Sequence, residues 1–297
     1  DNYVDSTDIT AITLARGTAA SGPGDIRDID IDGQITMLDA RQCVAQCAKP
    51  QCGAEYPGYT VVKLAPGDDL ETRTQAALID AEPNTVIELP AGTFHFKGNL
   101  SISVDNIVLR GKGNSANGGT VRNFARQTSG AQGILATGNN FVVEDLAVED
   151  TPGDGIKMEG NDGVTMRRVR VEWTGGPDED NGPYGLYPVQ TRNVLIEDSI
   201  VRGASDAGVY VGPSAIIIVR RNHVYENVAG IEIENSKFAD VYDNNTTGNT
   251  GGILVFDLPD LPVQGGRDVR VPRNLARGNN EPNFAPAGNI VGQVPAG

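Results

Sequence analysis

Five short segments of the chain share one pattern, in which a glycine is followed by an aliphatic residue that opens a predicted strand. The pattern starts at Gly155, Gly185, Gly208, Gly230 and Gly252, at spacings of 30, 23, 22 and 22 residues. A second aliphatic segment follows at residues 194–196, 216–218 and 239–241. A repeat of this length indicates a solenoid, in which each unit buries its apolar face only against its neighbours. A β-propeller would need about twice this period, and a leucine-rich repeat would need a leucine consensus that is missing. We therefore predict an all-β parallel β-helix with coils of about 22 residues over residues 61–297.

The repeat also predicts which residues point inward and which stack from coil to coil. Alternation along a strand places one set of side chains in the core, namely Ile156, Leu186, Val209, Ile231 and Ile253. Asparagines recur in register, Asn222 with Asn244 and Asn227 with Asn249. We expect these asparagines to hydrogen-bond between coils and to adopt left-handed backbone conformations in the turns.

The part of the chain before these coils has strand signals and one amphipathic segment. Residues 68–80 predict a short helix with an aspartate at its start as the cap, placed to plug the open end of the solenoid. Strands are expected at residues 85–89, 93–96, 100–104 and 107–109.

The segments YGLYPVQ at residues 184–190 and SDAGVYVG at residues 205–212 are similar to those of bacterial β-helix repeat proteins of the pectin-lyase-like superfamily. The resemblance spans about residues 60–297 and implies a right-handed β-helix. Many members of the superfamily are polysaccharide lyases, hydrolases or epimerases. Alginate C-5 epimerases of this fold carry an Asp-Pro-His-Asp motif, whereas this chain has Leu186-Tyr187-Pro188-Val189 at the nearest position. That difference argues against epimerase chemistry.

Stacking of the coils places polar residues in columns on the outer face. Lys157, Tyr187, Tyr210 and Glu232 form one such column, and we take them as candidate catalytic residues. Tyrosine rings offer flat surfaces for sugars. Candidate substrate-binding residues lie beside the column or at the strand ends; they are Asp206, Glu234, Asn235 and Asp257. Long loops at residues 174–183 and 257–266 are expected to wall a groove. The simpler interpretation is that this stacking only stabilises the sheet.

Residues 28–39, DIDIDGQITMLD, have the spacing of a calcium-binding loop. Carboxylates alternate at positions one, three and five, a glycine allows the turn at six, a main-chain oxygen is available at seven, and an aspartate closes the loop at twelve. The predicted ligands of Ca²⁺ are Asp28, Asp30, Asp32, Gln34 (main chain) and Asp39. Residues 40–47 are expected to form the helix that follows.

This segment resembles one repeat of a type I dockerin, which implies a small α-helical calcium module. We assign residues 1–53 to this module and residues 54–60 to a linker. The upstream residues 8–16 keep only the helix-like part of a second repeat, so one Ca²⁺ is predicted. A docking partner for the module is a further expectation from the resemblance.

The composition restricts the classes of binding partner and the cellular compartment that we expect for this protein. The net charge of −15 argues against nucleic acid and anionic membranes as partners, and no segment approaches 18 apolar residues. The chain starts at Asp1 and shows no signal-like segment, which is consistent with a signal peptide already removed and an extracellular, bacterial-type protein. The cysteines cluster at Cys43, Cys47 and Cys52. We favour a disulfide from Cys52 to Cys43 or Cys47 over reduced thiols.

Two functions follow from these features. The first is a secreted calcium-binding β-helix protein that binds or processes an extracellular, acidic polysaccharide; if it is an enzyme, a lyase or hydrolase is expected. The second is a non-catalytic protein that assembles head to tail with copies of itself. The second rests on residues 289–291, which read as the start of a further strand without a cap.

Overall fold

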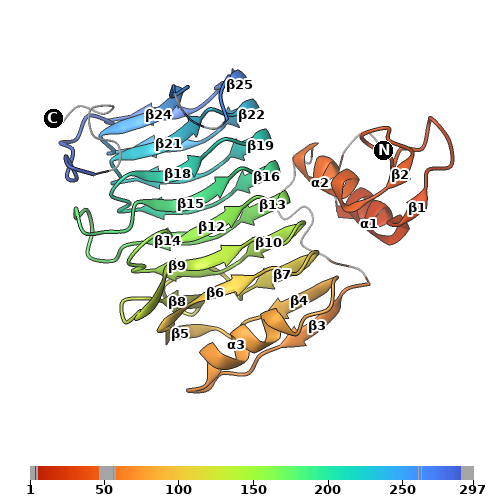
Figure 1. Cartoon of the computed structure of the whole chain (residues 1–297), viewed down its shortest axis with the longest axis horizontal. Coiled ribbons are helices and arrows are strands. Elements are labelled where there is room, and N and C mark those ends of the chain that lie inside the picture. Colours follow the sequence, from red (N-terminus) through yellow and green to blue (C-terminus); the bar gives the residue numbers. More distant parts are fainter. Residues whose placement is uncertain are drawn as a thin grey trace.

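The chain folds into a parallel β-helix with a small helical module beside it (Figure 1). The computed structural model describes residues 4, 6–46, 56, 58–259, 261 and 263–288. The predicted all-β solenoid is confirmed, because strands from successive coils pair in parallel throughout the β-helix. No helix among these residues is long and apolar enough to cross a membrane.

Three sheets run along the solenoid. The first has the order β25-β22-β19-β16-β13-β10-β7-β4-β3. In chain order its strands are β3 (Thr60–Lys63), β4 (Thr85–Glu88), β7 (Ile107–Arg110), β10 (Phe141–Glu144), β13 (Asp162–Arg167), β16 (Arg192–Glu197), β19 (Ala215–Arg220), β22 (Lys237–Tyr242) and β25 (Arg267–Arg270).

The second sheet consists of short strands. They are β5 (Gly92–His95), β8 (Thr120–Asn123), β11 (Ala147–Glu149), β14 (Arg170–Glu172), β17 (Ile200–Arg202), β20 (His223–Tyr225), β23 (Asn245–Thr247) and β26 (Leu275–Arg277). From β11 onward each is three residues long, which is too short for a periodic pattern. This third strand of each coil is missing from the sequence prediction for that reason.

The third sheet carries the glycine-led strands of the repeat. Its members are β6 (Gly98–Ile102), β9 (Ser129–Ala136), β12 (Ile156–Glu159), β15 (Tyr184–Val189), β18 (Ala207–Val211), β21 (Ala229–Glu234) and β24 (Gly251–Phe256). The glycine is required by close packing. A Cβ at Gly185 would lie 2.5 Å from the carbonyl oxygen of Gly208 on the next coil.

The core is a thin apolar column enclosed by the three sheets. The predicted inward residues Ile156, Leu186, Val209 and Ile231 are completely buried, and Ile253 packs against the same cluster. The predicted helix is α3 (Leu70–Ile79), and its Leu70 and Leu78 close the first coil. The prediction that an aspartate side chain caps this helix is wrong. Asp69 occupies the N-cap position, but its carboxylate makes no cap hydrogen bond and instead pairs with Arg73 at 2.9 Å.

The asparagine ladders are confirmed, but the left-handed residues are their neighbours. The amide of Asn222 donates to Asn244 Oδ1 at 2.9 Å, and Asn227 donates to Asn249 Oδ1 at 3.0 Å. The positive φ angles fall one residue earlier, for example at Arg221 with φ +55°. The asparagines are thus selected for their hydrogen bonds, and the backbone of the preceding residue makes the turn.

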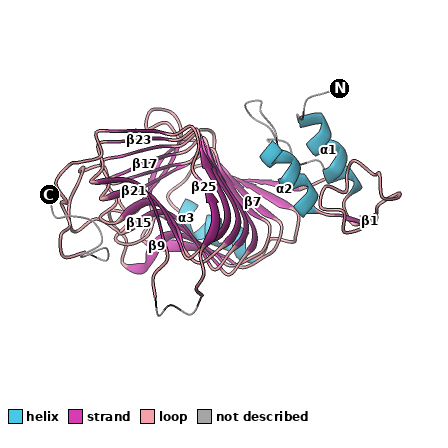
Figure 2. Cartoon of the chain, turned by 90° about the horizontal axis from the view of Figure 1, so that it is seen from above, coloured by secondary structure: helices cyan, strands magenta, loops and turns pink. Residues whose placement is uncertain are grey.

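The N-terminal module consists of α1 (Ser6–Ala15), β1 (Thr18–Ala19), β2 (Gln34–Ile35) and α2 (Met37–Gln46). It lies against the outer face of the first sheet, as the view along the solenoid shows (Figure 2). An apolar cluster joins Ile9, Ile12 and Val44 of the module to Leu195 and Ile218 of the sheet. Cys43 is buried in this cluster. Cys47 and Cys52 lie outside the described residues, so the predicted disulfide from Cys52 to Cys43 or Cys47 stays a prediction.

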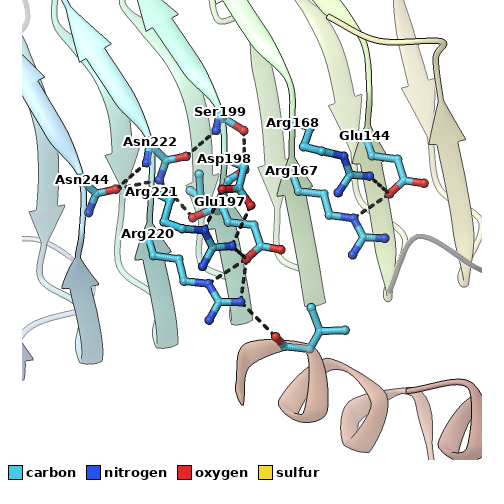
Figure 3. A network of polar contacts seen from close by, with 12 residues as sticks. Glu144, Arg167, Arg168, Glu197, Asp198, Ser199, Arg220, Arg221, Asn222 and Asn244 are labelled. Carbon is cyan, nitrogen blue, oxygen red and sulfur yellow. Dashed lines mark hydrogen bonds and ion pairs between the residues drawn. The ribbon is translucent and has the colours of Figure 1, made fainter. Parts of the chain in front are cut away.

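Polar contacts anchor the module on the same face. Arg41 donates to Asn140 and Thr165, and Arg220 donates to the carbonyl of Val44 at 3.0 Å. Around this contact, buried acidic and basic side chains alternate from one strand to the next (Figure 3). The column runs Glu88, Arg110, Glu144, Arg167, Glu197 and Arg220.

Candidate functional site

The outer face of the third sheet brings the predicted catalytic column together. Strand pairing places Lys157 beside Tyr187 and Tyr210 beside Glu232, on the consecutive strands β12, β15, β18 and β21. The column is continuous because Leu186 pairs with Val209, which aligns the tyrosines that follow them. The order inferred from the repeat is therefore the order in the structure.

Three tyrosines form the centre of this face. The Tyr184 and Tyr210 rings stack at 4.5 Å with an interplanar angle of 20°, and Tyr187 lies 4.6 Å from Tyr184 and 5.0 Å from Tyr210. Sequence reasoning did not select Tyr184 as a site residue. Strand alternation gave the opposite expectation, because Tyr184 lies two residues before the inward-pointing Leu186, yet its ring packs in the outer cluster.

Glu232 is a buried carboxyl group at the end of the column. It is 2 % exposed, and its Oε1 has no hydrogen-bond partner among the described residues. Burial, with the nearby charges of Asp206 and Glu234, raises the pKa of Glu232 to about 9. At neutral pH this group is therefore protonated.

Asp206 and Glu234 complete the acidic part of the site, and each interacts with a tyrosine. Tyr184 donates to Asp206, and Tyr210 donates to Glu234. Burial raises the pKa of Asp206 to about 6 and also raises the pKa of Glu234. These two of the three predicted substrate-binding carboxyls thus lie at the tyrosine cluster.

Lys157 occupies the other end of the column. Its ammonium group is 3.4 Å from Glu159 and 5.3 Å from the centre of the Tyr187 ring. Asp154, beside it, has its pKa raised to about 6 by burial, although the Lys157 charge acts in the opposite direction. Burial raises the pKa of Tyr187 to about 12, so this hydroxyl keeps its proton at neutral pH.

A segment from the end of the described chain covers part of this face. Ala285 is 2 % exposed and packs with Ala207, Val228, Ala229 and Tyr210, with Phe284 at the edge of the same cluster. Packing of Ala285 and Phe284 contributes to the burial of Tyr210, which is only 8 % exposed although its side chain points away from the core.

The two predicted loop walls have different positions from those expected. Asn181, in the loop at residues 174–183, donates to the carbonyl of Gly203 at 2.7 Å. A groove of about 620 Å³ lies between this loop and the covering segment, and Arg202, Glu226, Thr250 and Phe284 are among the residues that line it.

The second loop is held by two of the predicted substrate-binding residues. The amide of Asn235 donates to the carbonyls of Leu258 and Val263, and its oxygen accepts the Leu258 N–H. Asp257 accepts the Gly265 N–H. These contacts hold the second loop in place, and contact of Asn235 and Asp257 with a sugar stays a prediction.

The predicted calcium loop has its first three carboxylates close together. One oxygen from each of Asp28, Asp30 and Asp32 lies within 4.8 Å of the others. Gly33 has φ +87°, as the sharp turn at position six requires. Hard carboxylate oxygens at this spacing fit a Ca²⁺ ion.

The closing position of the loop is arranged differently. Asp39 is completely buried, and its carboxylate accepts N–H groups from Ile29, Asp30 and Thr36. It therefore fastens the loop to the start of α2. Gln34 lies in β2, where it pairs with Ala19. The structure brings together three of the five predicted ligands.

Comparison with known proteins bears on the fold. The family described as "Right handed beta helix region" matches residues 105–265, more than half of the chain. No curated protein matches the sequence significantly.

Two solved structures with similar folds illustrate the range of matches. The A-module of a mannuronan C-5 epimerase from Azotobacter vinelandii is 18 % identical, with a TM-score of 0.42 over 76 % of this chain and 78 % of that chain. A pectin methylesterase from Erwinia chrysanthemi is 12 % identical, with a TM-score of 0.39 over 80 % of this chain and 98 % of that chain.

Proposed function

The chain belongs to the right-handed β-helix family, and from this premise we propose that it binds and processes a polysaccharide on the outer face of its third sheet. The observation that carries the proposal is the stack of Tyr184, Tyr187 and Tyr210 beside the protonated carboxyl of Glu232. Aromatic rings of this kind pack against the apolar faces of sugar rings.

Glu232 is the proposed proton donor. A carboxyl group that keeps its proton at neutral pH can act as a general acid toward a glycosidic oxygen. Glu232 is 2 % exposed, so a sugar reaches it only after the residues around it open, and the proposed opening is a movement of Phe284 and Ala285 away from the tyrosine cluster. The proposed enzyme is thus closed in its free form.

The experiment is a turnover screen on the full chain with polysaccharides of different linkage and charge. In Glu232→Gln, the amide has the shape of the protonated acid but cannot transfer a proton. We expect turnover of the polysaccharide that is processed to fall about 10²–10⁴-fold while binding is retained. Asp68→Asn, an exposed change far from the face, is the control. Full turnover by Glu232→Gln would contradict the role of Glu232, and the absence of any bound or processed glycan would contradict the proposed function.

We also propose that the loop at residues 28–39 binds one Ca²⁺. Asp28, Asp30 and Asp32 would hold the ion, and the ion would supply the positive charge that offsets three neighbouring carboxylates. Its role is structural, because Asp39 links this loop to α2, which packs on the sheet. Secretion to the extracellular space remains part of this proposal.

A further inference from the structure

The tyrosine face carries more acidic than basic side chains. Its carboxyl groups belong to Asp154, Glu159, Asp206, Glu232 and Glu234. Within the described part of the chain, the cation that acts on this group is Lys157, and it already pairs with Glu159. With Glu232 protonated, the remaining carboxylates still outnumber this cation, so the described residues do not balance the negative charge of the face.

Two of these carboxyl groups have buried oxygens that lack a donor. Asp206 Oδ1 and Glu232 Oε1 make no hydrogen bond to any described residue, although Asp206 is 3 % and Glu232 2 % exposed. The nearby tyrosines do not supply these donors. The hydroxyl of Tyr184 donates to the other carboxylate oxygen of Asp206, and the hydroxyl of Tyr210 donates to Glu234. Buried polar atoms of this kind normally have a partner, so a ligand with donors is expected here.

We propose that this site selects a polysaccharide with free amino groups and rejects chains of uronic acids. This inference rests on the proposed function. An ammonium group brings both the missing positive charge and three N–H donors. A uronate would instead place a negative charge next to the carboxylates of Asp206 and Glu234. The 5.3 Å approach of Lys157 Nζ to the Tyr187 ring shows that this face accommodates an ammonium group.

This assignment revises the substrate class expected from the sequence. An acidic polysaccharide was consistent with the net charge only if a cation bridged it to the protein. The described arrangement of Asp206 and Glu234, with the unpartnered Oδ1 of Asp206, instead favours a cationic sugar, with these two carboxylates as the recognition groups.

The test compares three oligosaccharide probes on the full chain by calorimetry. The probes are chitosan oligomers with free amines, the same oligomers with N-acetyl groups, and oligogalacturonate. We expect the free amine to bind at least about tenfold more tightly than the N-acetyl form, which corresponds to one charge-assisted contact, and oligogalacturonate to bind weakest. Asp206→Asn and Glu234→Gln should each remove this preference. Asp68→Asn should keep it, and circular dichroism establishes that each variant is folded.

The outcomes separate the two proposals. Equal binding of the amine and the N-acetyl forms, or tightest binding of oligogalacturonate, would overturn the amine assignment and leave the proposed polysaccharide function in place. Failure of all three probes, together with an empty turnover screen, would overturn both. A preference for the amine that survives in both folded carboxyl variants would also overturn the assignment of Asp206 and Glu234.

Discussion

At the residue scale, burial converts an ordinary surface carboxyl into an acid that stays neutral. Glu232 occupies an outward position of β21, where the alternation of the strand predicts a solvated side chain. Its surroundings include Asp206 and Glu234, which disfavour a further negative charge. The column could be predicted from the repeat, whereas the pKa of Glu232 depends on how deeply its side chain is buried and on Asp206, which lies on another coil.

The pH dependence of stability follows from this raised pKa. Because the folded pKa of about 9 exceeds the ordinary value of a glutamate, the folded state holds a proton that the unfolded state releases between about pH 4.5 and 9. Glu232 therefore favours folding below this window, and that contribution is lost as the pH rises through it. We expect Glu232→Gln to be more stable than the natural chain at pH 8, with a difference in Tm that shrinks toward pH 5.

Thermal unfolding of both proteins from pH 5 to pH 9 measures this difference. A shift of about 2–4 °C for each kcal/mol is expected for a protein of this size. A constant offset across the whole range would contradict a raised pKa for Glu232, because the glutamine side chain of the variant does not titrate. A shift of the same form in the Asp68→Asn control would show that the effect is not specific to this site.

At the element scale, charge alternation fixes the register of the first sheet. Arg167 on β13 is 2.6 Å from Glu144 on β10, and both side chains are almost completely buried. One residue further along the chain, Asp145 pairs with Arg168 and Asp198 with Arg221. A strand displaced by one coil would bring like charges together, so the columns favour the observed order of coils.

Removal of one partner from this ladder should be costly. Arg167→Met leaves Glu144 buried with its charge only partly compensated by Arg168, and we expect a loss of about 3–5 kcal/mol in the free energy of unfolding. Urea denaturation gives this value. Arg273→Met is the matched control, since its pair with Asp243 is exposed and should contribute little to the free energy of unfolding. Equal losses in the two variants would show that burial does not determine the effect.

At the scale of the whole molecule, the helical module and the β-helix share one apolar contact. Val44 and Arg41 of α2 lie on β13, β16 and β19, and Asp39 connects the same helix to the calcium loop. A disordered loop would therefore weaken the contact as well as the module. Ca²⁺ binding and coverage of the first sheet are expected to be linked.

Chelation tests this linkage. Removal of Ca²⁺ from the full chain should expose the apolar face around Leu195 and Ile218, seen as increased binding of an apolar dye and faster hydrogen exchange in β16 and β19. The Asp30→Asn and Asp32→Asn pair should show both effects before chelator is added. Tight Ca²⁺ binding with unchanged exchange in these strands would disprove the link, and absence of Ca²⁺ binding would disprove the metal site.

Head-to-tail assembly remains a prediction, because residues 289–291, on which it rests, lie outside the described residues. Strand β25 is exposed and carries Arg267, Asp268 and Arg270, and Pro272 follows it closely. Charged side chains and a proline are features that discourage pairing at a sheet edge.

The sequence by itself determined the solenoid, its inward residues, the asparagine ladders and the order Lys157, Tyr187, Tyr210 and Glu232. Each of these depends on the spacing between neighbouring coils, which a repeat of about 22 residues records directly. Only the tertiary structure decided that Phe284 and Ala285 cover the column, that Asn235 holds a loop, and that the module lies on the first sheet. These contacts join segments far apart in the chain, and no periodicity encodes them. The chemistry of the site belongs to this second group, because the protonation of Glu232 depends on what covers and surrounds it.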